Sequence, residues 1–128
     1  MIAVGIGANS RAQQQDFETA LAKVGQEIGR ADVVLTFDGA RFAGQLSDVA
    51  RQLSIAYRAV GLDDMRARNG DCVTRTGRSH NLFGVASIAE AAALAGAGPR
   101  SRLVMPRRIV GNITIAAAQS ADVREHSR

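Results

Sequence analysis

The sequence predicts an α/β fold with three α/β/α layers and a mostly parallel (mixed), doubly wound sheet of about five strands. Short apolar runs alternate along the chain with segments of helical periodicity, which favours parallel strands joined by helical crossovers. The length of 128 residues fits one domain with one core. A hydrophobic content of 46% and a charged content of 22% are ordinary for a globular domain.

Three strands and two helices are expected in the first half of the chain. The expected strands are short apolar runs bounded by glycine or by polar residues, at 2–6, 33–37 and 55–60. Apolar residues recur every three or four positions within 13–28 and again within 42–53, which predicts two helices. We expect the three strands to be parallel, because each connection is long enough for a crossover.

The second half is expected to contain a loop, a helix and a final pair of strands. A short helical turn at 62–66 precedes a predicted loop at 68–80, in which Cys72–Thr74 could form a short strand. The expected elements after this loop are a helix within 84–98, closed by Gly96 and Gly98, and strands at 102–105 and 112–118. The last two strands are too close in sequence for a crossover, so they are expected to be antiparallel or widely separated. Residues 1–120 are predicted to form the domain, and 121–128 a polar tail.

Arginine dominates the positive charge, and it is unevenly distributed. The net charge is +4, and Lys23 is the single lysine among 16 basic residues. Residues 68–112 contain seven arginines against Asp71 and Glu90, so this segment carries 7 − 2 = +5. The planar guanidinium group suits carboxylates and phosphates. The segment therefore predicts either an anionic ligand or a basic face exposed to solvent.

The opening VGIGANS runs from an apolar strand into Gly5-x-Gly7, which is typical of an anion cradle before a helix. It matches the dinucleotide fingerprint only in part, because Ser10 stands where the third glycine belongs. Ligands of such sheets bind beyond the carboxyl ends of the strands. The segments expected there are 7–11, 38–41, 61–65, 76–81 and 106–112. The candidate binding residues in or next to them are Gly5, Gly7, Ala8, Asn9, Ser10, Arg11, Asp38, Arg41, Asp64, His80, Asn81, Arg107 and Arg108.

Catalytic candidates are Glu90, His80 and Asp38, and each has a structural alternative. Asp38 could cap the second helix. Ser87-Ile-Ala-Glu90 matches a capping box, which favours a structural Glu90. His80 lies in a polar loop, where a surface histidine is the more common case.

Several classes of function are not expected. No metal site is predicted, because Cys72 and the two histidines lack zinc spacing. Nucleic-acid binding is not predicted either, because Phe17, Phe37 and Phe42 fall at core positions. No apolar run is long enough to span a membrane, and Met1 leads directly into the first strand without a basic leader. The lone cysteine favours a reducing compartment, so we expect a cytoplasmic protein. We expect no cofactor.

Taken in order, six segments resemble the cobalamin biosynthesis family that comprises CobE and the C-terminal domain of CbiG. They are VGIGANSRA, VVLTFDGAR, LSIAYRAVGLDDMR, LFGVASIAEAAALAGAG, RLVMPRRIVGN and ITIAAA, and together they extend from Met1 to about Ser120. The chain departs from the family at two places: Ala8 stands where a Cys is common, and Pro106-Arg107 stands where a Lys is common.

This resemblance implies a protein that binds a polycarboxylate corrin or precorrin intermediate, as an accessory or carrier protein of the aerobic pathway. It adds Thr114, in the final strand, to the expected binding residues. It also implies other cobalamin-pathway enzymes as partners, and a homodimer is a further expectation. Two alternatives stay open. One is a hydrolase acting on a precorrin lactone, like the cobalt-precorrin-5A hydrolase that releases acetaldehyde. The other is a nucleotide-binding module in which Asp38 would bind the ribose.

Overall fold

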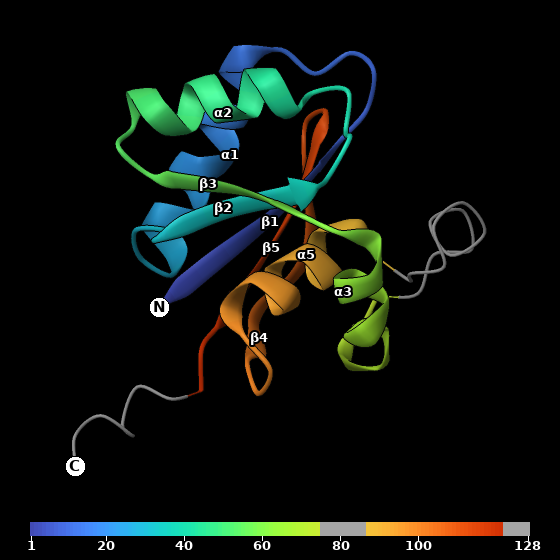
Figure 1. Cartoon of the computed structure of the whole chain (residues 1–128). Helices are drawn as coiled ribbons and strands as arrows, with labels where there is room; N and C mark the ends of the chain where they lie inside the picture. Colours follow the sequence, from blue (N-terminus) through green and yellow to red (C-terminus); the bar gives the residue numbers. More distant parts are fainter. Residues whose placement is uncertain (75–86, 122–128) are drawn as a thin grey trace.

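A five-stranded mixed sheet forms the centre of the fold, in the order β3-β2-β1-β5-β4 (Figure 1). It is seen in a computed structural model that describes residues 1–74 and 87–121. The first three strands pair in parallel, and β5 pairs antiparallel with both β1 and β4. The parallel start and the antiparallel final pair are therefore confirmed. The strands are β1 (Ile2–Ala8), β2 (Val33–Phe37), β3 (Ala56–Val60), β4 (Arg102–Val110) and β5 (Ile113–Gln119).

Helices cover both faces of the sheet, which confirms the three-layer prediction. One face packs against α1 (Gln14–Glu27) and α2 (Ala43–Gln52), and the other against α5 (Ile88–Ala97). The short α3 (Leu62–Ala67) and a single 3₁₀ turn (Asn69–Asp71) lie beside α5. In the described part of the chain, no helix is both long enough and apolar enough to cross a membrane.

Strand β4 is longer than the sequence predicts. Residues 106–110 continue the strand rather than forming a loop, and only Gly111 and Asn112 separate it from β5. Pro106 is tolerated because β4 is an edge strand whose pairing with β5 is interrupted by two irregularities. The expected short strand at Cys72–Thr74 is wrong, because these residues follow the 3₁₀ turn as irregular backbone.

Helix α5 lies unusually close to the sheet because its buried side chains are small. Eight of its ten residues are buried, and five of these eight are alanines. Beneath it, a Cβ atom on Gly5 of β1 would lie 1.9 Å from the carbonyl oxygen of Ala89. A Cβ on Gly96 would lie 2.3 Å from a methyl group of Leu35. The missing side chains of Gly5 and Gly96 therefore let the helix backbone approach β1 and β2.

The Arg68 side chain caps the C-terminal end of α5. Its guanidinium donates to the carbonyl oxygens of Leu94, Gly98 and Ser101 at 3.1, 2.6 and 2.7 Å. It also donates to the Ser101 hydroxyl at 2.9 Å and pairs with Asp71. A cation at these free carbonyl groups stabilises a helix end. One arginine of the +5 segment is thus structural.

Candidate functional site

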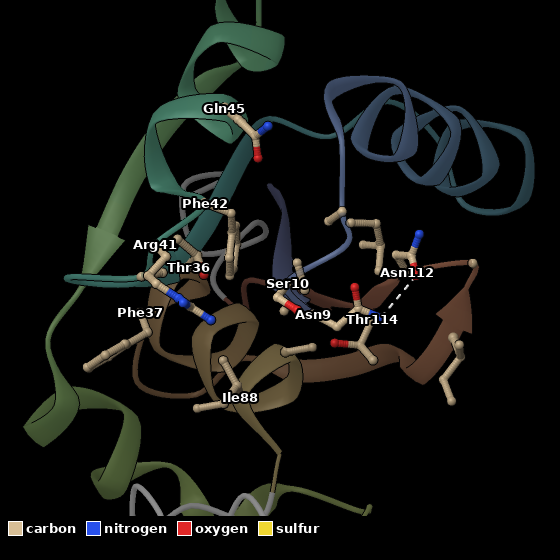
Figure 2. Close-up of a pocket in the computed structure, with 18 of the residues that line it drawn as sticks. Asn9, Ser10, Thr36, Phe37, Arg41, Phe42, Gln45, Ile88, Asn112 and Thr114 are labelled. Carbon is tan, nitrogen blue, oxygen red and sulfur yellow. Dashed lines mark hydrogen bonds between the residues drawn. The ribbon is translucent and has the colours of Figure 1, made fainter.

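A cavity of about 820 Å³ opens at the carboxyl ends of β1 and β2 (Figure 2). Its volume falls within the range of about 300–1,000 Å³ typical of small-molecule sites. Its walls come from the ends of β1 and β2, the loops that follow them, the start of α2, the N-terminus of α5 and the β4–β5 hairpin. The described residues that line it at polar or charged positions are Asn9, Ser10, Thr36, Arg41, Gln45, Ser87, Arg107, Asn112 and Thr114.

Two aromatic side chains form part of the wall. Phe37 ends β2 and Phe42 immediately precedes α2, and both are half-buried. Phe42 is held by Phe17 of α1, whose ring stacks on it with centroids 5.6 Å apart. The expectation that Phe37 and Phe42 fall at core positions holds in part: both are half-buried and pack against the core, and Phe42 also points into the cavity (Figure 2). Phe42 and Ile88 of α5 give the cavity an apolar surface, whereas the Phe37 side chain points away from its centre (Figure 2).

Two arginines also line the cavity. Arg41 follows β2, and its guanidinium points into the cavity (Figure 2). Arg107 lines the cavity from β4, three strand spacings away in the sheet, or about 14 Å. Among the described residues, neither arginine forms an ion pair. The cavity therefore has two cationic residues that come from different elements of the fold.

The loop after β1 is not the anion cradle that the glycines suggest. Gly5 and Gly7 lie inside β1, and α1 begins only at Gln14. Backbone N–H groups of the loop are already occupied: those of Arg11 and Ala12 donate to the Asn9 side chain and carbonyl, and that of Gln13 donates to Asp16. A cradle needs several free N–H groups directed at the ligand. This geometry gives no support to a phosphate-binding loop.

The same loop is fastened to the β4–β5 hairpin. The Asn9 side chain donates to Asn112 Oδ1 at 3.0 Å, and the Asn9 N–H donates to the Asn112 carbonyl at 3.1 Å. Asn112 in turn reaches Asp16 of α1 at 3.4 Å. These contacts tie two walls of the cavity together, so their spacing is set before any ligand binds.

The structure brings about half of the predicted binding residues to the cavity. Those that line it are Gly7, Ala8, Asn9, Ser10, Arg41, Arg107 and Thr114. Gly5 lies beneath α5, Arg11 and Asp64 are exposed outside the lining, and Arg108 pairs with Glu27 of α1. His80 and Asn81 lie outside the described residues.

Asp38 and Glu90, two of the catalytic candidates, do not line the cavity. Asp38 is exposed, and its expected role as the cap of α2 is wrong because that helix begins after Phe42. Burial raises the pKa of the Tyr57 phenol, and the Asp38 carboxylate adds to this shift. Glu90 is fully buried, and Ser87 forms the expected cap by accepting a hydrogen bond from the Glu90 N–H.

Sequence reasoning missed the lining residues Phe37, Phe42, Gln45, Ile88, Ile109 and Asn112. A signal for some of them was present. Phe37 and Phe42 flank the polar 38–41 segment that was already placed at the ligand edge, and Asn112 follows a glycine between two strands. Ile109 also lies in a segment placed at the ligand edge, 106–112, but its exposure of 62% depends on the unexpected length of β4.

Gly7→Val is expected to alter the cavity more than the stability of the fold. Gly7 has ordinary backbone angles, and a Cβ there would lie 2.5 Å from the Thr114 hydroxyl. Valine must therefore displace the Thr114 side chain from the cavity floor, at a cost of about 1–3 kcal/mol. Denaturant unfolding and the ligand titration described below measure the two effects. An unchanged affinity in a folded variant would show that this floor does not contact ligand.

The fold and the cavity define an α/β domain with a ligand site at the carboxyl edge of its sheet. The family model described as "Cobalamin synthesis G C-terminus" matches residues 2–118. The chain belongs to this family, and it is a CobE/CbiG-like protein of cobalamin biosynthesis. No curated protein sequence matches it.

Two solved structures are similar over nearly the whole chain. One is CobE, described as a protein from the cobalamin (vitamin B12) biosynthetic pathway, with a TM-score of 0.82 and 25% identity over 92% of each chain. The other is the cobalamin biosynthesis protein chiG from Agrobacterium tumefaciens str. C58. Its TM-score is 0.72 and its identity 28%, over 95% of this chain and 100% of that chain. The resemblance seen in the sequence is thus confirmed.

Proposed function

We propose that this protein binds a polycarboxylate corrin or precorrin intermediate and acts as an accessory or carrier protein. The observation that carries this proposal is the cavity of about 820 Å³ that apolar side chains line together with Arg41 and Arg107. A tetrapyrrole-derived ring offers a broad apolar surface with carboxylates around its rim. Apolar side chains favour the ring, and guanidinium groups favour the carboxylates. Family membership supports the same ligand class.

Binding is favoured over hydrolysis by the chemistry of the lining. No Asp, Glu, His or Cys stands among the described residues that line the cavity, so a general base or nucleophile of these types is missing there. Glu90, the strongest acidic candidate, has both carboxylate oxygens occupied by hydrogen bonds. We therefore propose that the protein works beside the enzymes that make or use the intermediate and is not itself a hydrolase. We also propose that it works in the cytoplasm.

An absorbance titration tests this function. Hydrogenobyrinic acid, a cobalt-free corrin with free carboxylates, is added to the protein at low and at high salt, and a dinucleotide is titrated in parallel. We expect a saturable change in the corrin spectrum at a 1:1 ratio. We also expect its affinity to fall several-fold as salt rises, because the arginines are partly exposed. Absence of a saturable change, or equal binding of the dinucleotide, would contradict the proposal.

A further inference from the structure

Glu90 is a buried carboxylate with an unusual set of partners. Its side chain is fully buried in the first turn of α5, next to the cavity but not in its lining. Oε1 accepts the N–H groups of Val73 and Thr74, both at 2.9 Å. Oε2 accepts the Thr74 hydroxyl at 2.9 Å and the Arg107 N–H at 2.7 Å.

None of these four donors is a charged side chain, so within the described part of the chain backbone and hydroxyl dipoles hold the negative charge. Burying a carboxylate is costly unless its oxygens are hydrogen-bonded, and the N-terminus of α5 favours a negative charge. The capping-box interpretation accounts for only half of this arrangement. Ser87 caps the helix, but the Glu90 carboxylate reaches two other parts of the chain.

One of these parts is the irregular stretch of β4. Between Met105 and Arg108 the register with β5 shifts, and Arg107 lies within this shift. Bulges re-aim the residues that they contain. Here the Arg107 N–H is directed to Glu90 on the α5 face, and Arg107 lines the cavity.

We propose that Glu90 is a positioning residue that holds the β4 edge of the cavity, and Arg107 with it, against the first turn of α5. The same carboxylate fixes Val73 and Thr74 to this turn. The effect of Glu90 on ligand affinity rests on the function proposed above, but the effect of Glu90 on the β4 backbone does not.

Glu90→Gln separates these roles with the smallest change in shape. A glutamine side chain has one acceptor oxygen and one amide donor group. With its oxygen toward Val73 and Thr74, it keeps both backbone bonds, and its NH₂ group can donate to the Thr74 hydroxyl. The Arg107 N–H then faces a second donor. The opposite orientation loses two backbone bonds, so Arg107 is the residue expected to lose its acceptor.

Amide hydrogen exchange measured by NMR tests the positioning directly. We expect exchange at Arg107 to be at least tenfold faster in Glu90→Gln than in wild type. Ser101→Ala is the matched control, because it removes buried hydrogen bonds at the far end of α5 and leaves Glu90 untouched. Unchanged exchange at Arg107, or equal acceleration in Ser101→Ala, would overturn the proposal whatever the ligand.

A double-mutant cycle tests the link to binding. Glu90→Gln is expected to lower the affinity for hydrogenobyrinic acid several-fold in the wild-type background. In the Arg107→Ala background it is expected to have no further effect on this affinity. Additive effects of the two substitutions would overturn action through Arg107, because a general loss of structure adds independently. If wild type fails to bind the corrin, the proposed function fails, and the exchange experiment still decides the role of Glu90.

Discussion

Gly5→Ala is expected to destabilise the fold by about 3 kcal/mol or more. The added Cβ would lie 1.9 Å from the carbonyl oxygen of Ala89 and 2.7 Å from the N–H nitrogen of Ala93. Both atoms are helix backbone, so no side-chain rotation relieves the overlap. The whole of α5 must move away from β1, which loosens the packing of its buried alanines. Urea denaturation followed by circular dichroism measures the loss.

Gly25→Ala is the matched control for this substitution. Gly25 lies in α1, and a Cβ there meets nothing within 4 Å. The same chemical change is therefore expected to stabilise the protein by about 0.5–1 kcal/mol, since alanine favours the helix. A Gly5→Ala variant that is as stable as wild type would show that α5 does not lie at this distance from β1.

The joint substitution Arg41→Gln with Arg107→Gln is expected to lower the affinity for hydrogenobyrinic acid by about 100-fold. Each guanidinium that bonds a carboxylate contributes roughly 1.5 kcal/mol, or about tenfold, at a partly exposed site. The two arginines come from β4 and from the loop after β2, so each single variant should lose about half of the binding free energy lost by the double variant. The salt dependence of the affinity should also become weaker.

Arg108→Gln supplies the control for this loss. It removes the same charge from the same strand, but Arg108 pairs with Glu27 of α1 and does not line the cavity. The affinity of the Arg108→Gln variant for hydrogenobyrinic acid should therefore remain close to that of wild type. A loss in Arg108→Gln equal to that in Arg107→Gln would mean that the net charge, rather than the cavity, governs binding.

The strands that local pattern alone determines were predictable. The 33–37 strand was located to the residue, because a continuous apolar run ends there at Asp38-Gly39. The length of β4 was not predictable in this way. A segment with Pro106 and two arginines is typical of a loop. Only the edge position of β4, with its shifted register, makes these residues acceptable in a strand.

The site was predictable in its location more than in its chemistry. The rule that ligands bind at the carboxyl edge places Ser10, Arg41 and Arg107 at the same edge of the sheet, and all three line the cavity. The role of Gly7 was misjudged, because β1 extends to Ala8, beyond its predicted end at residue 6, and Gly7 therefore lies inside the strand rather than in a turn. The partners of Glu90 are 16 or more residues away, so the capping motif could not indicate them.

Helix α5 packs against the sheet mainly through small buried side chains, and its layer has no free volume for larger ones. A Cβ at Gly5 would meet the backbone of α5 and one at Gly96 would meet the Leu35 side chain, so the position of α5 against the sheet is fixed by the fold itself. The opposite rim is different, because Arg41 and Gln45 are exposed and their side chains can be replaced without repacking the core. We therefore expect selectivity for one intermediate over another to depend on the segment between β2 and α2, while the α5 side of the cavity stays constant.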